Sequence, residues 1–256
     1  MSLFIFILFK NNSAKTRKTS GGIKKMKKIW IIVSLATIFG TCYEIVIAQE
    51  TDNKMSFFVT SVNLAGAAKK GEDGVGANLG GIEGADAHCQ SLAEAVGAGE
   101  QTWRAYMSTT TENARDRIGK GPWYNVYGQL MATNLEDLHE GNENITRENS
   151  FTESGGKIPG IADPGTIHDM LTGSGADGRM AVEQEGVGGI PEHKTGEPAT
   201  CNDWTGGKGR ARVGHFDSQH GESGTIWNSA HYSLGCSQED IEKNASIGLF
   251  YCFAAD

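Results

Sequence analysis

The clearest pattern of hydrophobic and polar positions lies between residues 85 and 96. Apolar residues recur there at intervals of three and four, at Ala85, Cys89, Leu92, Ala93 and Val96. This spacing places them on one face of an amphipathic helix, and Gly97 follows as a residue that ends helices. We therefore predict a helix over this stretch, with Cys89 on its buried face.

Strand-like patterns lie on both sides of this helix. Residues 56–61 are rich in β-branched and aromatic side chains, and residues 102–109 alternate and end in a run of threonines; both patterns are typical of strands. In a last run, 249–254, alternation gives two faces. One face holds Phe250, Cys252 and Ala254, and the other holds Leu249, Tyr251 and Phe253.

Two stretches are rich in glycine and short of large apolar side chains, residues 65–84 and 135–200. We predict loops for both, and the second is long enough to be either a functional loop or partly disordered. No internal repeat or interdomain linker separates the elements. The pattern thus indicates a single α+β domain with long loops within residues 49–256.

The first 48 residues have a different pattern. A lysine cluster at 24–28 is followed by an apolar run, 29–39, and by Val46-Ile47-Ala48. This order is typical of a secretory signal peptide, and we predict cleavage after Ala48. A membrane anchor is the alternative, although the run is shorter than the ~20 residues that span a bilayer. Met26 is an alternative start of translation, and Cys42 offers a weaker lipoprotein signal.

Removal of this segment changes the charge. It holds 8 of the 23 Lys and Arg residues but 1 of the 31 Asp and Glu residues, which leaves 15 positive against 30 negative charges. Such an acidic surface repels nucleic acid and anionic lipid. We therefore expect an extracytoplasmic protein, whether secreted, periplasmic or on the cell surface, that binds a glycan or an extracellular protein. We expect no nucleic-acid partner and no membrane insertion after cleavage.

Four cysteines remain outside the signal segment: Cys89, Cys201, Cys236 and Cys252. An even number in an exported chain predicts disulfides, and the absence of a C-x-x-C pair argues against zinc ribbons and thioredoxin-like chemistry. Four cysteines allow three pairings, and their positions alone leave the choice open.

Two segments and the order of the cysteines are similar to a known fold. Residues 80–90, Gly-Gly-Ile-Glu-Gly-Ala-Asp-Ala-His-Cys-Gln, resemble the helix entry of endostatin-like domains, a branch of the C-type lectin-like fold. Residues 102–108, Thr-Trp-Arg-Ala-Tyr-Met-Ser, resemble the strand that follows it. The resemblance covers about residues 57–132 and 200–256. It implies nested disulfides, Cys89–Cys252 and Cys201–Cys236.

Sugar-binding lectins of this fold hold calcium with a Glu-Pro-Asn and a Trp-Asn-Asp motif. This chain has Glu197-Pro198-Ala199 and Trp227-Asn228-Ser229 instead, so each motif lacks one oxygen ligand. Calcium takes six to eight oxygens, so we predict no cofactor, with calcium at this degraded site as the alternative. Endostatin-type zinc binding relies on histidines near the mature N-terminus, and residues 49–54 contain none.

The resemblance places the ligand face in loops, here residues 197–231. Candidate ligand-binding residues in this range are Glu197, Asn202, Asp203, Trp204, His215, Trp227 and Asn228. Sugar recognition pairs an aromatic ring with polar groups, as in Asn202-Asp203-Trp204 and Trp227-Asn228. The alternative is that both tryptophans belong to the core and that the polar residues form turns.

Histidines suggest two further sites. The stretch 215–220, His-Phe-Asp-Ser-Gln-His, together with His231, offers zinc-binding side chains, although a polar surface loop explains it as well. His168-Asp169 would suit a general base with its carboxylate. No nucleophile or phosphate-binding motif accompanies them, so we predict a binding module, not an enzyme, and no metal. The alternatives are an adhesive protein–protein module without a sugar site, or a small extracytoplasmic enzyme that uses His168 or the 215–220 cluster.

Overall fold

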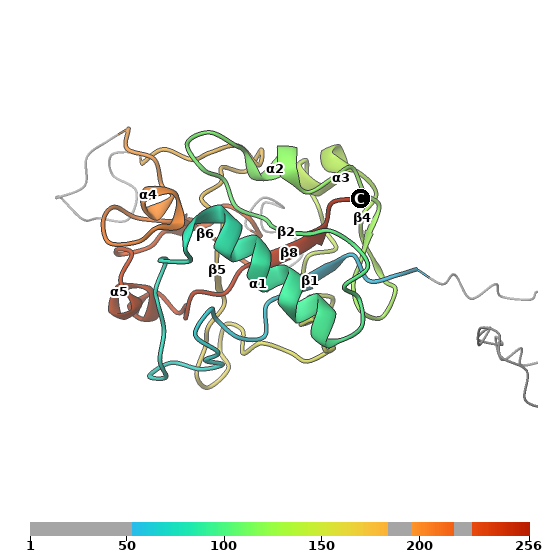
Figure 1. Ribbon diagram of the computed structural model, residues 1–256, viewed down its shortest axis with the longest axis horizontal. Helices are drawn as coiled ribbons and strands as arrows, with labels where there is room; N and C mark the ends of the chain where they lie inside the picture. The colour runs from blue at the N-terminus through green and yellow to red at the C-terminus, as the bar shows by residue number, and fades with distance from the viewer. Residues whose placement is uncertain (1–52, 184–195, 218–226) are drawn as a thin grey trace, which may run out of the picture. The chain divides into compact units, whose positions relative to one another are not determined.

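The computed structural model describes residues 53–183, 196–217 and 227–256, which all belong to one unit, Gln49–Asp256. The predicted signal peptide lies outside these residues. A mixed α+β architecture is built from short helices and three small sheets (Figure 1). No helix in the described ranges has both the length and the apolar character needed to cross a membrane.

The central sheet joins the two ends of the domain. Strands β1 (Phe57–Val59) and β2 (Trp103–Ala105) both pair antiparallel with β8 (Tyr251–Ala254), in the order β1-β8-β2. All four residues of β8 are buried, so both faces of the sheet are covered. The three strands are shorter than the strand-like runs of the sequence.

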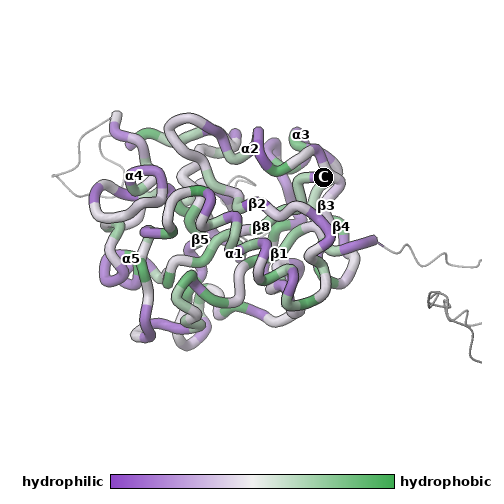
Figure 2. Tube along the Cα trace, in the orientation of Figure 1, coloured by the Kyte–Doolittle hydropathy of each residue, from purple (hydrophilic) through white to green (hydrophobic). Residues whose placement is uncertain are grey.

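The two faces of the last strand pack into two different hydrophobic clusters, as its alternation predicts. Leu249, Tyr251 and Phe253 belong to one cluster, whereas Phe250, Cys252 and Ala254 belong to the other. Figure 2 shows hydrophobic stretches along these central strands and hydrophilic ones in the outer turns. The sheet therefore divides the core into two layers.

Helix α1 (Gly81–Ala95) covers one face of the sheet and contributes Ala85, Cys89 and Ala93 to the second cluster. It begins four residues earlier than the apolar pattern suggests. Gly84 allows the early start, since a side chain there would collide with the Leu79 carbonyl. The disulfide Cys89–Cys252 ties the helix to β8, and it closes a loop long enough to stabilise the fold by roughly 5 kcal/mol in the chain-entropy model.

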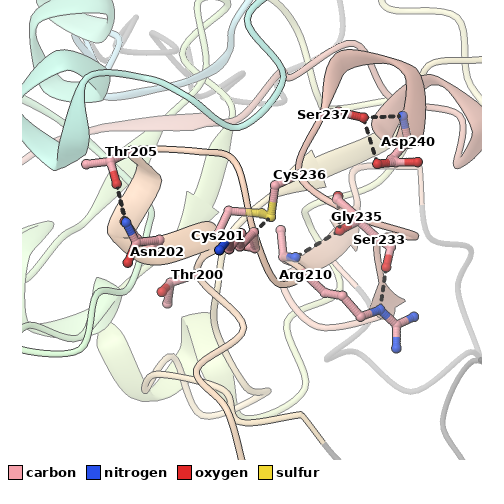
Figure 3. Close-up of a disulfide and its surroundings, with 12 residues drawn as sticks. Thr200, Cys201, Asn202, Thr205, Arg210, Ser233, Gly235, Cys236, Ser237 and Asp240 are labelled. Atoms are coloured by element: carbon pink, nitrogen blue, oxygen red, sulfur yellow. Dashed lines mark hydrogen bonds between the residues drawn. A yellow bond between two sulfur atoms is a disulfide. The ribbon is translucent and has the colours of Figure 1, made fainter. Parts of the chain in front are cut away.

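The second disulfide joins Cys201 with Cys236, so the structure has both pairs that the resemblance implies (Figure 3). Cys201 begins α4 (Cys201–Trp204), which is a single left-handed turn, since all four residues have φ between 50° and 64°. Left-handed turns of non-glycine residues cost energy and persist only where their surroundings hold them. Here the disulfide and the buried Trp204 fix both ends.

The remaining elements are short. Helices α2 (Ala114–Arg117), α3 (Leu135–His139) and α5 (Gln238–Lys243) lie between the strands. Strands β3 (Trp123–Tyr124) and β4 (Leu130–Ala132) form a two-stranded sheet. A third sheet has the order β5-β6-β7, from β5 (Asp169–Leu171), β6 (Arg212–His215) and β7 (His231–Tyr232).

The prediction of a core-poor loop over residues 135–200 is only partly right. The described part of this range, 135–183 and 196–200, contains α3 and β5. It also buries Leu138, Ile145, Ile167 and Met170 in the first cluster. These apolar residues are widely spaced between glycines, so they form no periodic pattern that would reveal them in the sequence.

Candidate metal centre

The two tryptophans of the predicted ligand face lie in the core. Trp204 and Trp227 have no exposed surface. Their indole N–H groups donate to backbone carbonyls, Trp204 to Ser108 at 2.9 Å and Trp227 to Leu138 at 3.1 Å. A ring without an exposed face has no surface on which a sugar can stack, so the placement agrees with the alternative that both are core residues.

The polar residues beside these tryptophans stabilise the chain locally. Asp203 accepts hydrogen bonds from the Thr110 N–H at 2.8 Å and from the Thr200 hydroxyl at 3.0 Å. Asn202 donates to the Thr205 hydroxyl at 2.6 Å (Figure 3). The buried Asn228 amide donates to the Tyr106 hydroxyl at 2.9 Å. These contacts are those of turn and core residues.

Glu197 is exposed, and its side chain makes no hydrogen bond or ion pair within the described ranges. The structure therefore does not gather the predicted ligand-face residues into one site. His215 differs from the rest, because it belongs to a cluster of imidazoles and carboxylates. The glycan-binding prediction stays a prediction. The candidate site that the described residues form is this cluster of histidines and aspartates.

The third sheet positions the cluster. Asp169 begins β5, His215 ends β6 and His231 begins β7. In the ladder Asp169 pairs with His215, and Val213 pairs with His231. Paired side chains point to the same face, as do residues two apart on one strand. Asp169, His215 and His231 therefore share one face of the sheet, and His168 precedes β5.

Three imidazoles converge at the carboxylate of Asp169. Its Oδ1 lies 3.0 Å from His215 Nε2 and 3.3 Å from His168 Nε2, and its Oδ2 lies 3.4 Å from His231 Nε2. The imidazoles also contact one another, since His168 stacks on His215 at 4.3 Å between ring centroids. His215 meets His231 edge to face at 4.9 Å.

Asp169 is fully buried, yet neither of its carboxylate oxygens has a hydrogen-bond partner, and neither does His215 Nε2. His215 and His231 nonetheless lie within ion-pair distance of the carboxylate, at 3.0 and 3.4 Å. An unpaired carboxylate in the interior is costly. The arrangement is the one expected of ligand atoms directed at a shared point between them.

The protonation of two imidazoles supports this interpretation. His168 Nδ1 donates to Asp217 Oδ1 at 2.9 Å, and His231 Nδ1 donates to the Tyr232 carbonyl at 3.1 Å. A neutral imidazole that donates from Nδ1 carries its lone pair on Nε2. In their neutral form both rings present an Nε2 lone pair to the Asp169 side of the cluster, as metal-binding histidines do, whereas a protonated His231 donates from Nε2 to Asp169.

The electrostatics agree with ionised carboxylates. Burial by itself raises the pKa of Asp169, but the neighbouring His215 and His231 outweigh burial and hold that pKa below its ordinary value. Burial also raises the pKa of Asp217, but the hydrogen bonds from His168 and the Ile161 N–H outweigh burial and lower it. Burial lowers the pKa of His231, and the attraction of Asp169 reverses this and raises it.

The donor set fits a transition metal. His168, Asp169 and His215 offer ligand atoms that lie within 4.8 Å of one another. Zinc binds imidazole and carboxylate at about 2.0–2.1 Å in tetrahedral geometry, which places ligand atoms about 3.3 Å apart. The separations from Asp169 Oδ1, 3.0 Å to His215 and 3.3 Å to His168, lie near this value, and His231 approaches the other oxygen, Oδ2, at 3.4 Å. A set of three imidazoles suits zinc better than calcium, which takes oxygen ligands.

The sequence pointed to the parts of this cluster but not to their combination. The zinc alternative contained His215, Asp217 and His231, whereas His168-Asp169 was considered as a general base. His220 lies outside the described residues. Neither interpretation contained the Asp169 carboxylate as a shared partner, because its pairing with His215 depends on strand register over 46 positions.

Comparisons with known proteins add no relative. No model of a protein family matches the chain, and no curated protein matches it.

Proposed function

We propose that this protein is an extracytoplasmic metal-binding protein that holds a divalent transition metal, zinc in the first place, with His168, Asp169, His215 and His231. The observation that carries the proposal is the fully buried Asp169, whose two unpaired oxygens face three imidazole nitrogens at 3.0–3.4 Å. A dication at this point would neutralise the carboxylate and use every unpaired atom.

Asp217 supports the site from outside. It holds His168 through Nδ1, and its other oxygen accepts the Ile161 N–H. Carboxylate–histidine–zinc triads of this kind fix the ring and raise its basicity. Asp217 is fully hydrogen-bonded and lies behind His168, whereas the Asp169 oxygens have no hydrogen bond. Metal centres typically combine such an outer carboxylate with free ligand atoms.

Two further features support the compartment. Both disulfides belong to an oxidising environment, and the acidic chain after residue 48 attracts cations. The disulfide pairing is also the support for our proposal that the domain is C-type lectin-like, closest to the endostatin-like branch.

The test is metal binding by the purified protein, prepared without a polyhistidine tag and stripped of metal. Calorimetric titration should give one zinc ion per chain. The double variant Asp169→Asn/His215→Gln should lose this binding, because it removes the shared carboxylate and one imidazole. His88→Gln is the matched control: His88 is a half-buried histidine whose Nε2 contacts the Val62 carbonyl, outside the centre.

The control should bind zinc as the wild type does. Equal zinc binding by the double variant and the wild type would contradict the proposal, since it would place the metal elsewhere. Circular dichroism and disulfide mapping would show that the double variant is folded.

A further inference from the structure

The four side chains of the centre are exposed to very different degrees. The exposed fraction of the side chain rises from 0% for Asp169 and 11% for His168 to 21% for His215 and 35% for His231. The centre is therefore closed behind Asp169 and open on the side of His231. Among the described residues, a metal ion held here would be most open to solvent on that side.

Three of the ligands form a tighter group than the fourth. The ligand atoms of His168, Asp169 and His215 all lie within 4.8 Å of one another, and His231 is outside this group. It reaches only Oδ2 of Asp169, at 3.4 Å. A metal bonded to the first three ligands would thus have a looser fourth ligand.

The contacts that hold the ligands in place also distinguish His231 from the other three. His168 is held by Asp217, whose own position is fixed by the Ile161 backbone. His215 lies on the middle strand of the sheet, directly paired with Asp169. His231 lies on the two-residue edge strand β7, and outside the cluster its ring is hydrogen-bonded, within the described ranges, to the carbonyl of the next residue. The best-held ligands are the three of the tight group.

Charge favours an additional ligand. A dication bonded to the Asp169 carboxylate and to neutral imidazoles keeps one positive charge on the metal and its direct ligands. The Asp217 carboxylate is not a direct ligand, because it contacts the outer nitrogen of His168. Catalytic zinc sites have three protein ligands and keep the fourth position for water or substrate, whereas structural sites are closed by four. Residual positive charge on the open side attracts a small anion.

We infer that the metal of this centre keeps an exchangeable position on the His231 side, which takes water or a small anion with an oxygen or nitrogen donor. The inference rests on the proposed function, because it needs a metal at His168, Asp169 and His215. It assigns His231 to the mouth of the site, as a ligand that is displaced or as a hydrogen-bond partner of the bound molecule.

The probe is the cobalt(II) form of the purified protein, whose visible absorption reports coordination. Azide and acetohydroxamate should each change the cobalt spectrum in a saturable way. In addition, His231→Ala should lower the cobalt affinity by less than about 10-fold. His168→Ala should lower it by more than the roughly 10–100-fold that loss of an outer-shell partner costs. The wild-type titrations need no variant, so they stand even if a variant fails to fold.

Two outcomes would overturn the inference, and they are distinguishable. A cobalt spectrum that neither anion changes, with His231→Ala as damaging as His168→Ala, means a closed four-ligand site; the proposed function then survives. Absence of any protein-bound cobalt or zinc overturns the proposed function and the inference together.

Discussion

Two buried aspartates in this domain have opposite surroundings. Asp86, in the first half of α1, uses both oxygens fully. Its Oδ1 accepts from the Ala105 N–H at 2.9 Å and from Arg117 Nη1 at 2.9 Å. Its Oδ2 accepts from Arg104 Nη1 at 2.6 Å and from Arg117 Nη2 at 2.8 Å. Asp169 is more deeply buried and has three nitrogens nearby, but neither of its oxygens is hydrogen-bonded.

The difference lies in what each partner can donate. A guanidinium carries fixed N–H donors in a planar fork that matches a carboxylate, so Arg117 completes the Asp86 site without any external group. Around Asp169, two of the three imidazoles donate from Nδ1 elsewhere, so each, when neutral, turns its Nε2 lone pair inward. A carboxylate beside neutral imidazoles needs a cation, which a proton on one ring or a bound metal ion supplies. Burial raises the pKa of both aspartates, and in both the neighbouring groups prevail and lower it.

A carboxylate whose oxygens are all hydrogen-bonded and one whose oxygens are not therefore have different roles in this fold. The Asp86 cluster connects α1, β2 and α2, and both oxygens of its carboxylate are hydrogen-bonded. The Asp169 cluster connects three strands and leaves several polar atoms without a hydrogen bond. Substitution of Asp86 should therefore lower mainly the stability of the fold, whereas substitution of Asp169 should lower mainly the affinity for metal.

The largest expected effect is on folding. Asp86→Ala leaves the Arg117 guanidinium, whose side chain is 4% exposed, without its main partner. Removal of one member of a buried ion pair costs roughly 3–5 kcal/mol, so urea denaturation should show a loss of that order. Zinc affinity should stay at the wild-type value in the folded fraction. A loss below about 1 kcal/mol would mean that the Asp86 cluster behaves as a surface ion pair does.

The second effect separates metal from fold at Asp169. Zinc at 100 times its dissociation constant should stabilise the wild type by about 2.7 kcal/mol, because it binds only the folded state. Asp169→Asn should abolish this gain. The metal-free variant should be less stable than the metal-free wild type, because the lowered pKa of Asp169 means that the folded state stabilises its ionised form. Thermal melts of both proteins with zinc and with a chelator measure both quantities. A zinc-induced gain that persists in Asp169→Asn would contradict the assignment.

The sequence was a good guide to the region around Asp86 and a poor one to the region around Asp169. Periodicity revealed α1, and alternation revealed the two faces of β8, because each pattern is local and reports burial directly. The resemblance supplied both disulfides. The left-handed turn α4 was not anticipated, because Cys201 and Trp204 rarely adopt positive φ, and Asn202 and Asp203 do so as single residues, not in a run of four.

The metal centre depends on long-range pairing. His168 and Asp169 are adjacent in sequence, but His215 and His231 reach them only through the register of β5-β6-β7. That register is set by three short strands in a glycine-rich stretch, where no hydrophobic period specifies it. The sequence therefore supplied the right residue types in separate hypotheses, and only the fold combined them.

A third, smaller effect concerns the outer carboxylate. Asp217→Asn keeps the shape but weakens the acceptor of the His168 Nδ1–H, so the imidazole becomes a poorer donor to the metal. Loss of such a partner lowers metal affinity by about 10–100-fold, or about 1.4–2.8 kcal/mol. Competition with a zinc chelator of known affinity measures this change. Asp163→Asn is the matched control: Asp163 also lies near Gly160 and Ile161, but its carboxylate pairs with Arg147. An equal loss in both variants would mean that the 160–163 turn, not His168, transmits the effect.

The smallest effect is a pH dependence at a third buried group, His139, which resembles Asp86 in being fully satisfied. Its Nδ1 donates to the Leu135 carbonyl at 2.7 Å, so Nε2 accepts from the Tyr106 hydroxyl at 2.8 Å. Burial lowers the pKa of His139, and the nearby Arg115 and Arg179 lower it further, against the opposing Leu135 carbonyl and Asp177 carboxylate.

A histidine with a lowered folded-state pKa takes up its proton first in the unfolded chain. Its contribution to stability is therefore complete above the ordinary pKa of about 6.5 and declines as the pH falls below it, by up to about 0.7 kcal/mol between pH 7 and pH 6. His139→Gln can still accept from Tyr106 but does not titrate. The difference in unfolding free energy between wild type and variant should therefore shift in favour of the variant as the pH falls from 7 to 6. The other titrating groups are common to both proteins and cancel. A difference that stays constant with pH would show that His139 has the same pKa in both states, and a shift toward the wild type would show that the folded protein stabilises its charged form.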